Sequence, residues 1–161
     1  MIIDITPEMR AKSKELSLKI FGKEKGLGWK DKFKTGYELA ADYVGFLGEI
    51  AFAKAYKLPE PVFLERAKDD YDFLIEGKTI DLKTKSEKTK DFLINIPQYE
   101  RKKGKIDIFV FGEIYGDYFR VVGWVEYDRV PEISRKILFP NGSRAWALKK
   151  RELKKIADLI V

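Results

Sequence analysis

The sequence predicts an α/β domain in which helices flank a central mixed β-sheet of about five strands. Three features of the 161-residue chain predict this class. Two helical patterns come first, five stretches with strand character follow between residues 71 and 127, and a helical pattern occupies residues 151–160. A chain of this length suits one compact domain, so we expect residues 1–161 to fold as a single unit.

Helix signals define the first part of the chain. A helix is expected from about Pro7 to Phe21, with Thr6 as its N-cap. A second helix is expected over about Tyr37–Tyr56, where apolar residues recur at three- and four-residue spacing. Residues 22–36 between them are rich in glycine and lysine and show no helical or strand period, so we expect a basic loop there.

The strand signals follow in close succession. The predicted strands cover about residues 71–75, 79–85, 92–97, 106–114 and 118–127. Glu76-Gly77 and Gly116-Asp117 are the expected hairpin turns. After an irregular stretch from Pro131, residues 146–148 predict a short edge strand, and residues 151–160 predict a C-terminal helix.

The amino-acid composition limits which side chains could take part in catalysis or metal binding. The chain has no cysteine and no histidine, which excludes thiolate and imidazole chemistry and leaves carboxylates, lysine, hydroxyls or an oxygen-bound metal. Charged residues make up 36% of the chain and amides are rare, a bias typical of thermophiles. The net charge of +6 favours a polyanionic partner, nucleic acid first and an anionic membrane second. With no transmembrane-length apolar run and no signal-peptide pattern, we expect a cytoplasmic protein.

The segment YDFLIEGKTIDLKTK, residues 71–85, is the first candidate site. If Glu76-Gly77 is a two-residue turn, Asp72 lies opposite Asp81, and Lys83 points to the same side. Opposed carboxylates destabilise a sheet unless a cation lies between them, and Mg²⁺ prefers such oxygen ligands. Lys83 would then hold a phosphate or position a water. The alternative is a cross-strand salt-bridge cluster on a solvated face.

Glu49 is a third carboxylate of interest because it lies among apolar residues of the second predicted helix. Gly45 and Gly48 precede it in the same helix, and glycine inside a helix suggests close approach of another element. One interpretation is a Glu49 paired with a nearby lysine. The other is a helix glutamate that completes an acidic pocket over the strands.

In order along the chain, Glu49, Asp72, Asp81-Leu82-Lys83 and, after the third predicted strand, Gln98 resemble the motif of the PD-(D/E)xK nuclease superfamily. The resemblance covers about residues 37–127 and implies a restriction-endonuclease-like core. Asp70 has the same strand parity as Asp72 and competes for the first-strand role. Exonuclease branches of this superfamily often have the pattern Gln-x-x-x-Tyr. Here the residue four positions after Gln98 is Lys102 instead of tyrosine, and this difference favours an endonuclease.

The resemblance implies divalent-metal-dependent hydrolysis of DNA phosphodiester bonds by a restriction-like, Holliday-junction-resolving or phage recombination endonuclease. It implies Mg²⁺ or Mn²⁺ on Glu49, Asp72, Asp81 and the Leu82 carbonyl, with Lys83 stabilising hydroxide or phosphate and Gln98 orienting a water or a phosphate oxygen. It also implies a homodimer, for which the apolar last hairpin would serve. The alternatives are a catalytically inactive nucleic-acid-binding module of the same fold, a RecB-like exonuclease and an RNA-directed nuclease.

Basic residues around these positions are the expected DNA contacts, because lysine and arginine neutralise backbone phosphates. An aromatic residue in the loop 22–36 adds a surface for stacking or wedging. The candidates are Trp29, Lys30, Lys32, Lys34, Lys85, Arg101, Lys102 and Lys103.

Overall fold

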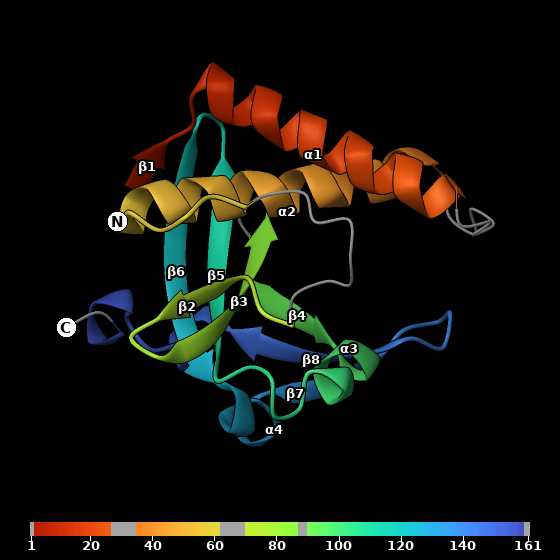
Figure 1. Ribbon diagram of the computed structural model, residues 1–161. Helices are drawn as coiled ribbons and strands as arrows, with labels where there is room; N and C mark the ends of the chain where they lie inside the picture. The colour runs from red at the N-terminus through yellow and green to blue at the C-terminus, as the bar shows by residue number, and fades with distance from the viewer. Residues whose placement is uncertain (1, 27–34, 62–69, 87–89, 160–161) are drawn as a thin grey trace. The chain divides into compact units, whose positions relative to one another are not determined.

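The computed structural model describes residues 2–26, 35–61, 70–86 and 90–159 (Figure 1). The helices are α1 (Pro7–Gly26), α2 (Thr35–Tyr56), α3 (Ile96–Arg101) and α4 (Val130–Ile133). The strands are β1 (Ile2–Asp4), β2 (Phe73–Ile75), β3 (Lys78–Lys85), β4 (Asp91–Asn95), β5 (Ile108–Tyr115), β6 (Tyr118–Glu126), β7 (Arg135–Leu138) and β8 (Arg144–Lys149). Short 3-10 turns cover Tyr127–Arg129, Lys150–Glu152 and Ile156–Asp158.

Two sheets organise these strands. The larger sheet has five strands in the order β1-β6-β5-β3-β2, and the smaller has three in the order β4-β8-β7. β1 pairs antiparallel with β6, and β2 pairs antiparallel with β3. Thr79, near the start of β3, and Asp107, just before β5, are hydrogen-bonded, so β3 and β5 start from the same end and run parallel. The predicted α/β fold with a mixed five-stranded sheet is confirmed in these coarse terms.

The membership of the sheets differs from the prediction. The expected third strand, β4, lies in the smaller sheet, and the N-terminal β1, which sequence patterns did not indicate, takes a place in the larger one. β8 is longer than the predicted strand at 146–148 and is the central strand of its sheet, so the prediction of an edge strand was wrong. β7, in the stretch expected to be irregular, supplies the second neighbour of β8.

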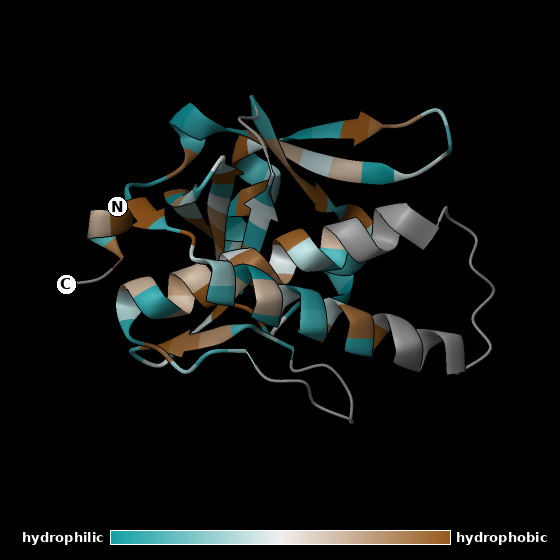
Figure 2. Ribbon diagram, turned by 90° about the horizontal axis from the view of Figure 1, so that it is seen from above, coloured by the Kyte–Doolittle hydropathy of each residue, from teal (hydrophilic) through white to brown (hydrophobic). Residues whose placement is uncertain are grey.

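The described chain divides into two compact units. The first comprises Met1–Lys68, Thr84–Glu87 and Glu113–Arg120, and the second comprises Asp69–Lys83, Lys88–Gly112 and Val121–Val161. In the first unit α1 lies alongside α2 (Figure 1). Figure 2 shows that the described parts of both helices carry hydrophobic and hydrophilic positions. Thr6 caps α1 as predicted, because its Oγ1 accepts a hydrogen bond from the Met9 N–H at 3.3 Å.

The region expected to be a loop at residues 22–36 is partly helical. α1 continues to Gly26 and α2 begins at Thr35, so both ends of the predicted loop were wrong. The predicted contacts Trp29, Lys30, Lys32 and Lys34 lie outside the described residues. Within the described segments, no helix combines the length and the apolar character that a bilayer crossing requires.

Gly48 lets α2 approach β3 inside the first unit. A Cβ at Gly48 would lie 1.9 Å from Oγ1 and 2.7 Å from Cβ of Thr84. This confirms the expected close approach at Gly48. At Gly45 the structure shows no such approach, because no atom of another element in the described residues lies within 4 Å of an added Cβ.

A Gly48→Ala substitution is expected to destabilise the protein by about 1–3 kcal/mol, because overpacking at Thr84 exceeds the gain of about 1 kcal/mol in helix propensity. Urea unfolding measures the change. Gly45→Ala is the matched control and should be neutral or stabilising. A Thr84→Ala change should recover part of the loss in the Gly48→Ala background, and equal stability of the two alanine variants would contradict this packing.

The core of the second unit is aromatic and aliphatic. It consists of Phe92, Ile94, Ile106, Phe109, Phe111, Val125, Tyr127, Val130 and Leu148. The rings of Phe92 and Phe111 have centroids 4.8 Å apart, a spacing typical of stabilising aromatic pairs. Ile108 to Ile114 are all buried on β5, and only Tyr115 is exposed. The apolar residues of β5 up to Ile114 are therefore buried and do not form an exposed surface for a homodimer, which stays a prediction.

The C-terminal segment, described up to residue 159, is not the helix predicted for residues 151–160. The backbones of Lys154 and Trp124 form two hydrogen bonds, of 2.9 and 3.1 Å, and the Trp124 Nε1–H donates to the Lys155 carbonyl at 2.9 Å. Gly123 makes this approach sterically possible, because a Cβ there would lie 2.6 Å from the Lys154 carbonyl oxygen. Tertiary pairing with β6 therefore overrides the local helical pattern.

Candidate functional site

The β2–β3 hairpin has the register that the sequence predicted. Glu76 and Gly77 have φ angles of 49° and 79°, which is the left-handed pair that a two-residue type I′ turn requires. Phe73 pairs with Ile80, and Ile75 pairs with Lys78. The Asp72 N–H donates to the Ile80 carbonyl at 2.8 Å, so the hairpin contacts reach Asp72 just before β2.

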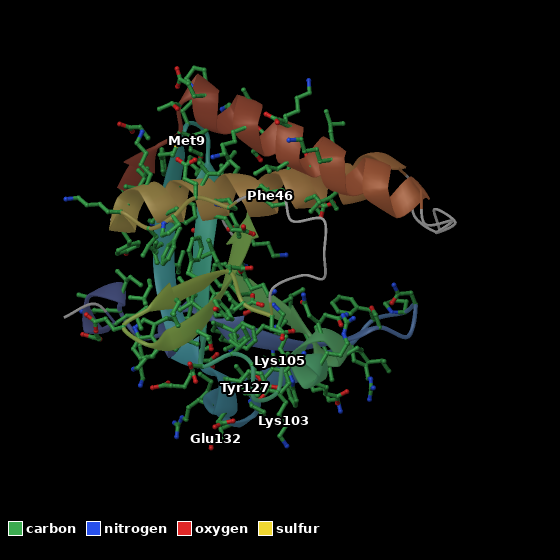
Figure 3. The ribbon with its side chains drawn as sticks, viewed as in Figure 1. Met9, Phe46, Lys103, Lys105, Tyr127 and Glu132 are labelled. Atoms are coloured by element: carbon green, nitrogen blue, oxygen red, sulfur yellow. The ribbon has the colours of Figure 1, made fainter. Side chains whose placement is uncertain are left out.

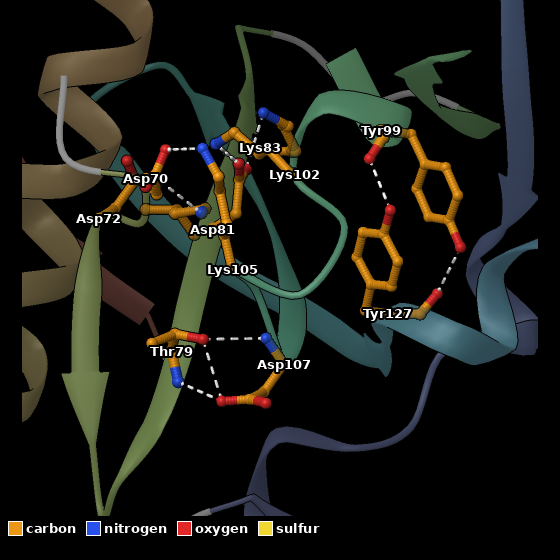
Figure 4. A network of polar contacts seen from close by, with 11 residues as sticks. Asp70, Asp72, Thr79, Asp81, Lys83, Tyr99, Lys102, Lys105, Asp107 and Tyr127 are labelled. Atoms are coloured by element: carbon orange, nitrogen blue, oxygen red, sulfur yellow. Dashed lines mark hydrogen bonds and ion pairs between the residues drawn. The ribbon is translucent and has the colours of Figure 1, made fainter. Parts of the chain in front are cut away.

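Asp81 is the buried centre of a charged cluster in the second unit (Figure 4). Its side chain is 1% exposed, and its two oxygens face two ammonium groups. Oδ1 lies 2.7 Å from the Lys83 Nζ, and Oδ2 is paired with the Lys102 Nζ. Oδ1 accepts no aligned hydrogen bond within the described residues, so its contact with Lys83 is an ion pair alone. A buried carboxylate needs such partners, because an unpaired charge is costly to bury.

Asp72 is the second carboxylate of this cluster. Its Oδ2 accepts a hydrogen bond from the Leu82 N–H at 2.7 Å. The surrounding protein displaces water from the carboxyl group and, together with the negative charge of Asp81, raises the pKa of Asp72 to about 6. The residue as a whole is exposed, so solvent reaches it and screens part of this repulsion. The negative charge of Asp81 therefore disfavours the ionisation of Asp72.

Asp70, the competitor for the first-strand role, lies in a different pair. Its Oδ1 is 2.8 Å from the Lys105 Nζ, and both side chains are about half exposed. Figure 4 shows this pair beside Asp72, Asp81, Lys83 and Lys102. The structure thus pairs Asp70 with Lys105, whereas the negative charge of Asp81 acts on Asp72.

Lys102 comes from the end of α3, which sequence patterns did not indicate. Asn95 caps this helix by accepting the Gln98 N–H at 3.1 Å, and Pro97 occupies the first turn. The Asn-Ile-Pro order was a usable helix-start signal, but residues 96 and 97 were assigned to the preceding strand. Lys102 is the C-cap residue, and its N–H donates to carbonyl groups of the last turn.

Two contacts fix the segment that carries Lys102. The rings of Tyr99 and Tyr127 stack at a centroid distance of 4.2 Å, and each hydroxyl donates to the carbonyl of the other residue, at 3.0 and 2.6 Å. After the helix, Asp107 accepts hydrogen bonds from both the N–H and the hydroxyl of Thr79 at the base of β3. α3 and the following loop are thus anchored on both sides of Lys102 (Figure 4).

The remaining predicted site residues divide by location. Gln98 lies on α3, four residues before Lys102. Of these two residues, Lys102 is the one that contacts Asp81 in the described part of the chain. Glu49 on α2 is half-buried and, like Lys85, belongs to the first unit. The placement of Glu49 beside the two aspartates and metal binding by the Leu82 carbonyl both stay predictions.

The residues in and after α3 that were predicted to contact DNA differ in their surroundings. Lys102 was expected to contact DNA but is engaged by Asp81 in the structure. Arg101 and Lys103 are exposed, and Lys103 and Lys105 both lie on the loop after α3 (Figure 3). This segment brings Lys102 and Lys105 into ion pairs with Asp81 and Asp70.

The donor set fits a divalent cation that keeps most of its water. Two neighbouring carboxylates are present, and Asp81 Oδ1 has no aligned hydrogen-bond donor. Mg²⁺ often binds proteins through one or two carboxylates and several waters. Among the residues that the structure describes, no three acidic side chains form a group that could enclose a metal ion. Asp72 and Asp81 are the two residues of this cluster that could act as ligands of a hydrated ion, in place of the ammonium groups that now face Asp81.

Asp72→Asn is expected to stabilise the metal-free protein at pH 8 by about 1 kcal/mol after allowance for solvent screening. The folded pKa of about 6 exceeds the ordinary 3.8, so the contribution of Asp72 to stability is present below pH 3.8 and is lost as the pH rises through 6. Asparagine keeps the acceptor for the Leu82 N–H but removes the charge. Urea unfolding in chelator at pH 4 and pH 8 measures the difference. Asp70→Asn should bring no such gain, and a loss of stability at pH 8 for Asp72→Asn would contradict the repulsion.

Comparison of the chain with protein-family models, curated proteins and solved structures finds no match in any of the three.

Proposed function

We propose that the chain is a divalent-metal-dependent nuclease that hydrolyses phosphodiester bonds in DNA, with Asp72, Asp81 and Lys83 at its reactive centre. The observation that carries the proposal is the juxtaposition of Asp72, just before β2, with Asp81 and Lys83 on β3, where the charge of Asp81 acts on Asp72. The described contacts of this cluster use ammonium groups to balance Asp81, and a cation would also offset the charge of Asp72.

In this proposal Asp72 and Asp81 hold Mg²⁺ or Mn²⁺, together with the Leu82 carbonyl as the motif implies. Such an ion, when bound, lowers the pKa of a water and offsets charge on the phosphate. Lys83 donates to a non-bridging phosphate oxygen while water adds to phosphorus, the bond to the leaving oxygen breaks and that oxygen takes up a proton. The exposed Arg101 and Lys103 bind flanking phosphates, which fits the net charge of +6.

A nucleic-acid-binding module without catalysis is the second candidate. The observation in its favour is that Asp81 is already neutralised by Lys83 and Lys102. In that case the cluster is a buried ion network that orders the α3 loop, and the basic loop binds the backbone of DNA.

DNA cleavage in the presence of different cations separates the two candidates. The wild type is incubated with supercoiled, linear and four-way-junction DNA, and with RNA, in Mg²⁺, in Mn²⁺ and in chelator. We expect cleavage of DNA that requires the cation, is lost in Asp81→Asn and persists in Asp117→Asn, an exposed carboxylate of the β5–β6 turn paired with Arg10. Binding without cleavage on every substrate would favour the module, and cleavage in chelator would contradict the mechanism.

A further inference from the structure

Lys102 holds an unusual position in the carboxylate cluster. It reaches the buried Oδ2 of Asp81 from a different element, whereas Asp72, Asp81 and Lys83 all belong to the β2–β3 hairpin segment. The Lys102 side chain is 19% exposed, so part of it already reaches solvent. One buried carboxylate is thus shared between an ammonium of its own strand and an ammonium of a neighbouring loop.

The backbone at Lys102 is fixed by contacts that do not involve its ammonium group. Its N–H donates to the carbonyls of Gln98 and Tyr99, and Tyr99 is locked to Tyr127. Gly104, with a φ of 74°, then turns the chain toward the Thr79–Asp107 contact. The four-carbon stem of lysine can therefore swing away from Asp81 while the loop keeps its place.

We propose that Lys102 is an exchangeable counter-ion of this site: it pairs with Asp81 while no divalent cation is bound, yields that position to the cation, and then binds a phosphate of the nucleic acid. The inference rests on the cation site of the proposed function. An ammonium on Oδ2 and a divalent ion on the same carboxylate repel each other strongly at such short range. Cation binding and phosphate capture by Lys102 are thereby coupled.

The first test measures Mn²⁺ affinity by electron paramagnetic resonance, without nucleic acid. Lys102→Gln removes the competing charge and keeps a hydrogen-bond donor, so Mn²⁺ should bind roughly tenfold more tightly than to the wild type. Lys103→Gln, on the adjacent exposed position, should leave the affinity unchanged. Equal Mn²⁺ affinity of the wild type and Lys102→Gln, with binding lost in Asp81→Asn, would overturn the counter-ion role and leave the metal site intact. Absence of Mn²⁺ binding in every variant would overturn the metal site and this inference together.

The second test uses the salt dependence of DNA binding, with Ca²⁺ in place of Mg²⁺. With Ca²⁺ present, Lys102→Gln should lower the slope of log affinity against log salt by about 0.9, the value for one phosphate contact. In chelator the slope should equal that of the wild type, because Lys102 is then held by Asp81. Lys103→Gln should lower the slope in both conditions. A Lys102 effect that is the same in both conditions would contradict the exchange.

A measurement on the wild type guards against a variant that fails to fold. Amine-reactive labelling followed by mass spectrometry should show slow modification of Lys102 in chelator and several-fold faster modification in Mn²⁺. Lys105, which pairs with Asp70, serves as the internal reference and should change little. Unchanged or slower labelling of Lys102 on Mn²⁺ addition would overturn the proposal.

Discussion

Asp81→Ala is expected to lower the free energy of unfolding by about 3 kcal/mol, because it leaves two ammonium groups facing each other without their buried partner. Asp81 is 1% exposed and pairs with both Lys83 and Lys102. The half-exposed pair of Asp70 and Lys105 is the matched control, and Asp70→Ala should cost at most about 1 kcal/mol. Urea unfolding at pH 7 in chelator measures both changes.

A double-mutant cycle shows whether this loss arises from the ion network. Lys102→Met in the Asp81→Ala background should cost less than Lys102→Met alone, because the buried charge that Lys102 compensates is already gone. Additive losses would mean that the two side chains stabilise the protein independently, against the contact in the structure.

Lys83→Met is expected to reduce the rate of DNA cleavage by about 100- to 1000-fold, the effect typical of removing one donor to developing charge on the reacting group. Methionine preserves the length and packing of the stem, and Lys102 remains to balance Asp81. Single-turnover kinetics in Mg²⁺ measures the rate of the chemical step. Lys78→Met, on the opposite face of β3 and exposed, is the control that should cleave at the wild-type rate. A Lys83→Met rate within a few-fold of the wild type would remove Lys83 from the reactive centre.

The hairpin could be predicted because its register depends on local rules. A two-residue turn at Glu76-Gly77 and alternation along each strand are enough to bring Asp72 toward Asp81. The second long helix was predictable for the same reason, since its apolar spacing and the prolines after it are local signals.

The partners of Asp81 could not be fully predicted, because one of them depends on tertiary placement. The position of Lys83 beside Asp81 follows from strand parity. Lys102 reaches Asp81 because the chain leaves β4 early to form α3, and because contacts between Tyr99 and Tyr127 hold α3 in place. The prediction of a C-terminal helix was wrong for a similar reason. Its pairing with Trp124 beside Gly123 is a long-range contact that outweighs helical periodicity.

The most direct test of the account is the crystal structure of the protein soaked in Mn²⁺, with the anomalous signal recorded. We predict a manganese peak within coordination distance of both Asp72 and Asp81, with the Lys102 ammonium displaced from Asp81. Crystals soaked at millimolar Mn²⁺ could instead keep the Lys102–Asp81 ion pair and show no manganese peak at the two aspartates. That result would contradict the proposal that this cluster is the metal site of a nuclease.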